Sequence, residues 1–110
     1  MFKHEDDRRS LIEMQPGSFR ACKVVKIKKR SILGNHFHTK KDEQFLLISG
    51  KAYLVKIGED EWRNIEAPYE WFVPMGSYHT FDLEEGSIMV GTATREFDPE
   101  DENADTNTSR

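Results

Sequence analysis

The chain contains 110 residues, enough for one domain but too few for a large α/β enzyme. Sixteen Lys and Arg stand against twenty Asp and Glu, so the net charge is −4. This balance, together with the lack of a nucleic-acid-binding motif, argues against a nucleic-acid partner. The longest apolar run, Phe45–Ile48, is too short to span a membrane. The first residues lack the apolar region of a signal peptide, so we expect a cytoplasmic protein that does not enter membranes.

Composition divides the chain into three parts. Residues 1–19 are expected to form an N-terminal arm with a first strand, and residues 20–97 a single barrel. Residues 98–110 carry five carboxylates and a single apolar side chain, Ala104. Such a segment cannot bury enough apolar surface to fold, so it is expected to be an acidic, disordered tail.

Short apolar segments separated by turn residues predict strands along the barrel. In residues 23–30, Val25 and Ile27 alternate with lysines, as in a strand with one buried face. No window longer than ten residues has the period of a helix, so the sequence predicts an all-β sandwich or barrel. The expected strands are Lys23–Arg30, Glu43–Ile48, Ala52–Ile57, Trp62–Ile65, Trp71–Val73, His79–Leu83 and Ser87–Thr94.

Three histidines and one glutamate form the pattern with the clearest chemical meaning. His36 and His38 are two residues apart, so on a strand both imidazoles point to the same face. A hairpin through the polar turn Thr39–Asp42 could bring Glu43 back beside them, and His79 follows much later. Three imidazole nitrogens and one carboxylate oxygen suit Fe, Mn, Co, Ni, Cu or Zn. The same groups could also transfer protons near neutral pH.

These residues resemble the two motifs of the cupin superfamily. The pattern is His36-x-His38-x4-Glu43-x6-Gly50, followed by Pro74-x-Gly76-x2-His79. The resemblance implies a double-stranded β-helix, a small jelly-roll barrel, over about residues 20–97. It also implies a divalent metal, of unknown identity, held by His36, His38, Glu43 and His79.

A narrower resemblance connects the chain with cupins that epimerise or isomerise nucleotide-linked 4-keto sugars. Its segments are Asp7–Leu11, Gly34–His38, Gln44–Leu46 and Ser49–Lys51. The segment Glu96–Glu100 is similar to the carboxyl-terminal cupin domain of capsular-polysaccharide reductases. In these relatives an arginine usually precedes the Gly-x-His-x-His run and helps to hold the substrate, whereas this chain has Leu33.

The isomerase resemblance implies catalytic roles for two histidines and one tyrosine. His36 or His38 would be the general base beside the ketone, and Tyr78 or Tyr53 would be the acid. Abstraction of a proton next to a carbonyl requires a base near that carbon and a donor for the enolate oxygen.

A basic stretch precedes and includes the histidine motif. Residues 14–41 contain eight Lys and Arg and no acid, and Arg30 is the nearest arginine to the histidine pair. Arg30 is therefore the candidate for binding a substrate phosphate, although such residues can equally be solvent-facing charges on a strand edge. The aromatic residues Trp62, Trp71, Phe72 and Phe81 are expected in the core or in a homodimer interface.

Three functions remain open at this point. The first is a sugar-nucleotide epimerase or isomerase in surface-polysaccharide biosynthesis. The second is a metal-dependent cupin enzyme of another kind, a dioxygenase or a lyase, which the full ligand set favours. The third is a non-catalytic cupin that binds a small molecule, which Leu33 favours because the usual arginine is missing.

Overall fold

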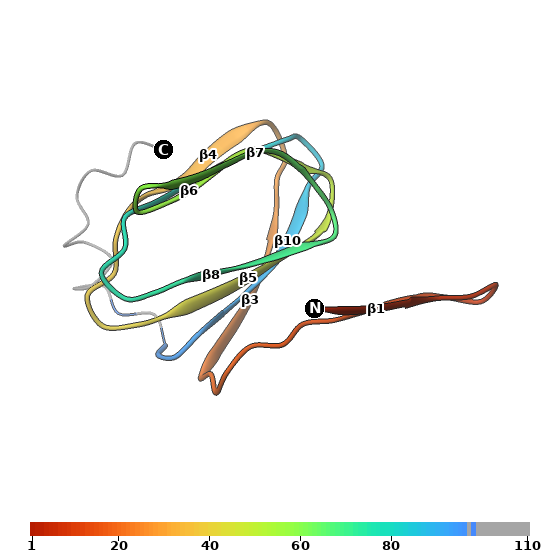
Figure 1. Ribbon diagram of the computed structural model, residues 1–110, viewed down its shortest axis with the longest axis horizontal. Helices are drawn as coiled ribbons and strands as arrows, with labels where there is room; N and C mark the ends of the chain where they lie inside the picture. Colours follow the sequence, from red (N-terminus) through yellow and green to blue (C-terminus); the bar gives the residue numbers. More distant parts are fainter. Residues whose placement is uncertain (97, 99–110) are drawn as a thin grey trace.

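Ten strands make up the regular structure of the computed structural model, which describes residues 1–96 and 98 (Figure 1). The predicted acidic tail, residues 98–110, lies outside the described residues except for Asp98. In the described part of the chain there is no helix of the length and apolarity that a membrane crossing requires. The strands are β1 (Phe2–Glu5), β2 (Ser10–Glu13), β3 (Ala21–Lys26), β4 (Ser31–His36), β5 (Glu43–Ser49), β6 (Lys51–Ile57), β7 (Asp60–Glu66), β8 (Tyr69–Val73), β9 (His79–Leu83) and β10 (Ile88–Ala93).

Eight of these strands form two antiparallel sheets of four. One sheet has the order β3-β10-β5-β8 and the other β4-β9-β6-β7, so many neighbours in a sheet are distant in sequence. Figure 1 shows the two sheets facing each other across the interior. Two facing antiparallel sheets connected in this way are a jelly roll. The predicted all-β fold, a double-stranded β-helix of the cupin type, is confirmed.

The interior is filled from the central strands of both sheets. Alternation turns Phe45 and Leu47 of β5, and Phe81 and Leu83 of β9, into the barrel, where all four are buried. The Phe81 ring packs edge-on against the rings of Phe45 and Trp71, at centroid separations of 5.1 and 5.2 Å. Burial of one such side chain contributes roughly 1.5–3 kcal/mol. These contacts hold the two sheets together and leave the cavity described below at one end.

The six strands predicted between residues 43 and 94 are found as β5 to β10. The predicted single strand Lys23–Arg30 was wrong, because the chain leaves one sheet after β3 and enters the other at β4. At the crossing, the Ile27 N–H donates to the carbonyl of Ser87 (2.9 Å), and its carbonyl accepts from the N–H of Gly86 (2.7 Å). Ile27 is buried in the interior although it lies between the two strands. The alternation of apolar and polar residues therefore continues past the end of β3, and the sequence pattern does not show where the strand ends.

The N-terminal arm forms a β1–β2 hairpin that projects away from the barrel (Figure 1). Its ends are connected to the barrel through Glu70 of β8. One carboxylate oxygen of Glu70 lies 3.3 Å from the terminal amino group of Met1, and the other accepts the N–H of Gln15 at 3.1 Å. The hairpin is therefore held by polar contacts at its base.

Candidate functional site

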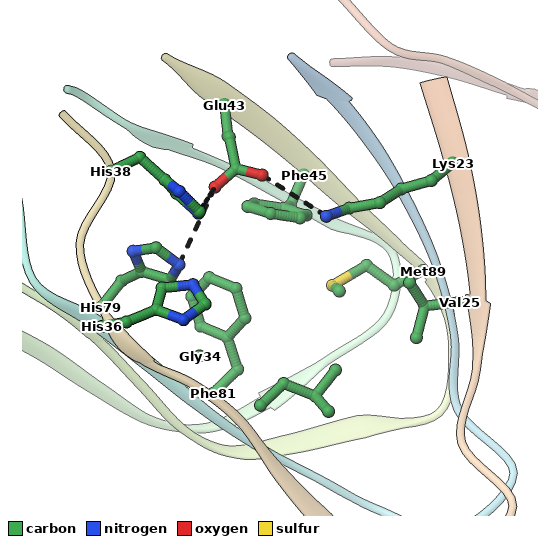
Figure 2. Close-up of a pocket in the computed structure, with 11 residues that line it drawn as sticks. Lys23, Val25, Gly34, His36, His38, Glu43, Phe45, His79, Phe81 and Met89 are labelled. Atoms are coloured by element: carbon green, nitrogen blue, oxygen red, sulfur yellow. Dashed lines mark hydrogen bonds and ion pairs between the residues drawn. The ribbon is translucent and has the colours of Figure 1, made fainter. Parts of the chain in front are cut away.

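A cavity of about 350 Å³ lies between the two sheets at the end of the barrel where β5 and β9 begin (Figure 2). Imidazoles and a carboxylate line one side, and aliphatic and aromatic side chains line most of the rest, together with one lysine. The lining residues are Lys23, Val25, Leu33, Gly34, His36, His38, Glu43, Phe45, His79, Phe81 and Met89. A largely apolar cavity with a few convergent polar groups is the usual form of a small-molecule site.

A bulge in β4 places His36 and His79 side by side. The pairing of β4 with β9 shifts between Gly34 and His36, with Asn35 as the extra residue. Gly34 and Asn35 both have positive φ values, 82° and 64°. A Cβ atom on Gly34 would lie 2.8 Å from the carbonyl oxygen of His79 and 3.0 Å from its ring, so only glycine allows this approach.

His38 lies beyond the end of β4, so the predicted strand geometry holds only for His36. Its backbone is tied to the turn before β9, because the N–H of Gly76 donates to the His38 carbonyl at 2.7 Å. The carboxylate of Asp42 accepts the N–H of Met75, also at 2.7 Å. These bonds join the loop that carries His38 to the turn that presents His79.

The three histidines converge from these different segments. The ring centroids of His36 lie 4.6 Å from those of both His38 and His79, and the latter two are 5.4 Å apart. One nitrogen from each ring lies within 4.8 Å of the others, and all three side chains are buried. The structure therefore brings together the histidines that the sequence singled out.

Glu43 connects the histidines to Lys23 (Figure 2). Its Oε1 lies 3.2 Å from Nε2 of His38 and 3.8 Å from Nε2 of His79, while Oε2 lies 3.5 Å from Nζ of Lys23. Burial raises the pKa of Glu43, but the contact with His38 and the charge of Lys23 outweigh it and lower the pKa to about 2. Glu43 is thus an anion at neutral pH.

Burial also keeps His79 neutral. It lowers the pKa of the His79 imidazole, and the nearby charge of Glu43 opposes this only in part. Its Nδ1 faces the carbonyl of Ser77 at 3.3 Å, which fits the tautomer that keeps Nε2 free of hydrogen. A neutral imidazole with its lone pair directed into the cavity can accept a proton or bind a metal.

The three histidine side chains can hold a divalent metal ion, and Glu43 lies beside them without belonging to the group of ligand atoms within 4.8 Å of one another. Glu43 Oε1 is buried and accepts no well-aligned hydrogen bond, although two histidine nitrogens are close to it. A buried carboxylate oxygen without a donor is costly, and a cation would compensate it. Three imidazoles and one carboxylate match the ligands that Zn²⁺ and other first-row metals prefer.

Comparison with known proteins identifies the family. Residues 4–88 match the model of the family described as "Polysaccharide biosynthesis C-terminal domain". The chain belongs to this family. No curated protein matches the chain in sequence.

Solved structures share the fold. The capsular polysaccharide assembling protein CapF from Staphylococcus aureus matches with a TM-score of 0.62 and 24% identity, over 90% of this chain. The chain spans only 32% of that CapF chain. A 3,4-ketoisomerase from Helicobacter canadensis matches with a TM-score of 0.73 and 15% identity, over 90% of this chain and 82% of its own.

A mutant of the 3,4-ketoisomerase QdtA from Thermoanaerobacterium thermosaccharolyticum, in complex with TDP-4-keto-6-deoxyglucose, is also similar. Its TM-score is 0.72 at 16% identity, with 90% of this chain and 79% of that chain covered. Together with the family, these matches confirm the resemblance to cupins of polysaccharide biosynthesis.

In this member of the polysaccharide biosynthesis C-terminal domain family, three other predicted site residues lie outside the cavity lining. Arg30 makes a two-pronged ion pair with Asp82, at 3.1 and 2.9 Å, and its guanidinium lies 3.9 Å above the Tyr53 ring. The Tyr53 hydroxyl contacts Glu84 at 3.4 Å. Tyr78 donates a hydrogen bond to the side-chain oxygen of Asn35 in the β4 bulge, at 2.8 Å.

Lys23 is the functional candidate that sequence reasoning missed. It reaches into the cavity from β3, pairs with Glu43, and lies 5.6 Å from the centroid of the Phe45 ring. Strand alternation could have found it, because Lys23 is two residues before the inward-facing Val25. A lysine in a basic run is usually solvated, and this expectation concealed it.

Gly34 provides a test of how the site is assembled. Gly34→Ala and Gly58→Ala both place a side chain at positive φ, but only Gly34 has no room for the Cβ. We expect Gly58→Ala to cost roughly 1–2 kcal/mol in unfolding free energy, and Gly34→Ala to cost about 1–3 kcal/mol more through crowding against His79. Urea denaturation would measure both, and equal losses would show that the close approach to His79 is unimportant.

Proposed function

We propose that this protein isomerises or epimerises a nucleotide-linked 4-keto sugar in surface-polysaccharide biosynthesis, with residues 20–97 as the functional barrel. The observation that carries the proposal is the buried cluster of His36, His38 and His79 at one wall of a largely apolar cavity, which Glu43 and Lys23 also line. Membership of a polysaccharide biosynthesis family supports the substrate class. The fold shared with 3,4-ketoisomerases supports the reaction type.

Both reactions begin with the same chemical step. A base removes a proton from the carbon next to the C4 ketone, and the electron pair of that C–H bond forms an enolate. Return of a proton to the opposite face of that carbon gives an epimer. Transfer of the C3 hydroxyl proton to the C4 oxygen, with return of the abstracted proton to C4, moves the ketone to C3 and leaves a hydroxyl at C4. Neither reaction needs an oxidant or a reductant, so imidazoles near neutral pH suffice as acid and base.

His38 is the best candidate for the base, with His36 beside it. The Glu43 carboxylate, 3.2 Å from Nε2 of His38, stabilises the imidazolium that forms when His38 takes a proton. Of the two predicted acids we favour Tyr78, because it precedes His79 in sequence and its hydroxyl bonds to Asn35 in the β4 bulge, beside His36. We propose a structural role for the Arg30–Tyr53 contact, because the Arg30 charge is already matched by Asp82.

We also propose that His36, His38, Glu43 and His79 can hold a divalent metal ion. A bound metal would act as a Lewis acid that polarises a substrate carbonyl. Nitrogens that bind a metal cannot also serve as bases, so metal occupancy distinguishes the isomerase from the second candidate, a metal-dependent cupin enzyme of the dioxygenase or lyase type. The unsatisfied Oε1 of Glu43 is the observation that favours this second candidate.

We further propose that the protein is a cytoplasmic homodimer. On the sheet β3-β10-β5-β8, the row Val24–Val90–Leu46 faces away from the cavity, because the adjacent Lys23, Val25, Phe45 and Met89 line it. Val24 is 62% exposed, and Phe72 on the same outer face is 50% exposed. Small cores gain from further burial of apolar surface, and a second copy would supply it.

The isomerase proposal predicts hydrogen exchange with solvent. In D₂O, the protein should introduce deuterium next to the ketone of TDP- or UDP-4-keto-6-deoxyglucose, as NMR would detect. His38→Gln should slow this exchange by roughly 10²–10⁴-fold through loss of the base. His4→Gln, which changes a histidine in the projecting hairpin, should have no effect. Absence of exchange with both substrates would refute the proposal.

Elemental analysis would test the metal site. After reconstitution with Zn²⁺, Mn²⁺ or Fe²⁺, we expect about one metal ion per chain by mass spectrometry. His79→Ala should lose the metal, because it removes one of three converging nitrogens. His4→Ala should keep it. A metal-free protein after all three reconstitutions would assign the histidines to proton transfer alone.

The proposed homodimer can be tested with one substitution on the outer face of each sheet. Val24→Lys on β3 should convert a dimer into a monomer, measured as mass by light scattering at micromolar concentration. Ile32→Lys, at a position 49% exposed on β4 of the other sheet, should leave the mass unchanged. A monomeric mass for the unmodified chain would exclude the homodimer at that concentration.

A further inference from the structure

The extra residue in β4 decides which side of the sheet His36 occupies. Side chains of a regular strand alternate between its two faces, so Leu33 and His36, which are three residues apart, would face opposite sides. Both nevertheless line the cavity. Asn35 is the residue inserted where the pairing of β4 with β9 shifts. His36 therefore faces the cavity because Asn35 interrupts the alternation before it.

The backbone of Asn35 is strained. Its φ of 64° lies in the left-handed region, which side chains other than that of glycine adopt at a cost, although asparagine tolerates it better than most. Such conformations persist where neighbouring contacts hold them, and they are common at functional sites. Asn64, exposed on β7, also has a positive φ, of 53°. Asn35 differs from it in lying beside a histidine of the cavity.

The side chain of Asn35 connects the bulge with the segment that presents His79. Its Oδ1 accepts a hydrogen bond from the Tyr78 hydroxyl at 2.8 Å and lies 3.4 Å from the Thr80 hydroxyl. Tyr78 and Thr80 are the two neighbours of His79 in the chain, and His79 is the residue that pairs with His36. One amide oxygen thus contacts both sides of the histidine that His36 must meet.

We propose that Asn35 is a positioning residue whose side-chain amide holds His36 against His79. The inference rests on the proposed function, because these histidines form the wall that contains its base. The two rings meet edge-on, with centroids 4.6 Å apart. Without the amide, the bulge loses its contacts with Tyr78 and Thr80, and a shift of β4 moves the His36 ring away from His79. The cavity lining does not include Asn35, so Asn35 acts through His36 and not on the substrate.

Asn35→Gly isolates the amide, because glycine accepts the left-handed backbone and lacks the side chain. Asn64→Gly makes the same change at the exposed site on β7 and is the matched control. In the deuterium-exchange assay, Asn35→Gly should lower kcat by roughly ten- to a hundredfold with KM almost unchanged, since a displaced group weakens mainly the transition state. Asn64→Gly should change kcat by less than about twofold. Urea denaturation should find both variants folded.

Nuclear Overhauser effects measure the geometry directly. The unmodified chain and Asn64→Gly should show a contact between the ring protons of His36 and His79. Asn35→Gly should weaken or abolish this contact but keep the one between Phe45 and Phe81, whose centroids lie 5.1 Å apart in the core. A residue that only stabilises the fold would lower the free energy of unfolding and leave kcat and both ring contacts unchanged.

The outcomes separate this inference from the function on which it rests. If the unmodified chain gives no deuterium exchange, the proposed function fails, and the His36–His79 contact alone decides the role of Asn35. If exchange occurs but Asn35→Gly keeps both kcat and that contact, only the role of Asn35 is overturned. A lower kcat with the contact intact would also overturn it, since Asn35 would then act by another route. So would loss of the contact between Phe45 and Phe81, which would show a change in the whole barrel.

Discussion

The buried carboxylate of Glu43 is the constraint on which the site depends. An uncompensated anion in a protein interior is strongly destabilising, so the groups around it must supply positive charge or hydrogen. Lys23 supplies positive charge to one oxygen, whereas His38 and the neutral His79 lie beside the other, which accepts no well-aligned hydrogen bond. Because Glu43 begins β5, whose backbone pairs with both β8 and β10, the carboxylate has a fixed position. Glu43 and the side chains that approach it form the polar wall of the cavity.

The site exists only when both sheets are packed together. His36 and His79 come from β4 and β9 of one sheet, whereas Glu43 and Lys23 come from β5 and β3 of the other. The aromatic contacts of Phe81 with Phe45 and Trp71 bridge the same two sheets directly behind this wall. Core packing and site geometry are consequently coupled, and a change that separates the sheets would also separate the histidines from their carboxylate.

Much of the fold followed from local patterns, but the contacts of the long polar side chains did not. Alternation and turn residues located β5 to β10, and motif spacing located the three histidines and Glu43. The sequence did not reveal that the chain changes sheets at Ile27, because a buried isoleucine is compatible with either a corner or a continuous strand. Arg30 is near the histidines in sequence, yet it faces Asp82 on the outside of its sheet. Proximity in sequence cannot show which side of a barrel a side chain occupies, and the bulge at Asn35 changes that side within one strand.

The end of the barrel opposite the cavity determines how a ligand can enter and leave. There Leu47, Ala52, Leu83 and Ser87 are completely buried, and Ile27 closes the corner with two backbone hydrogen bonds to Gly86 and Ser87. A molecule in the cavity cannot pass through this plug, so it must leave on the side by which it entered. Under the proposed function, product and incoming substrate would share the same passage, and each turnover would have to clear it before the next could begin. For a reversible reaction between two sugars of nearly equal size, departure and re-entry of the product would compete directly with fresh substrate.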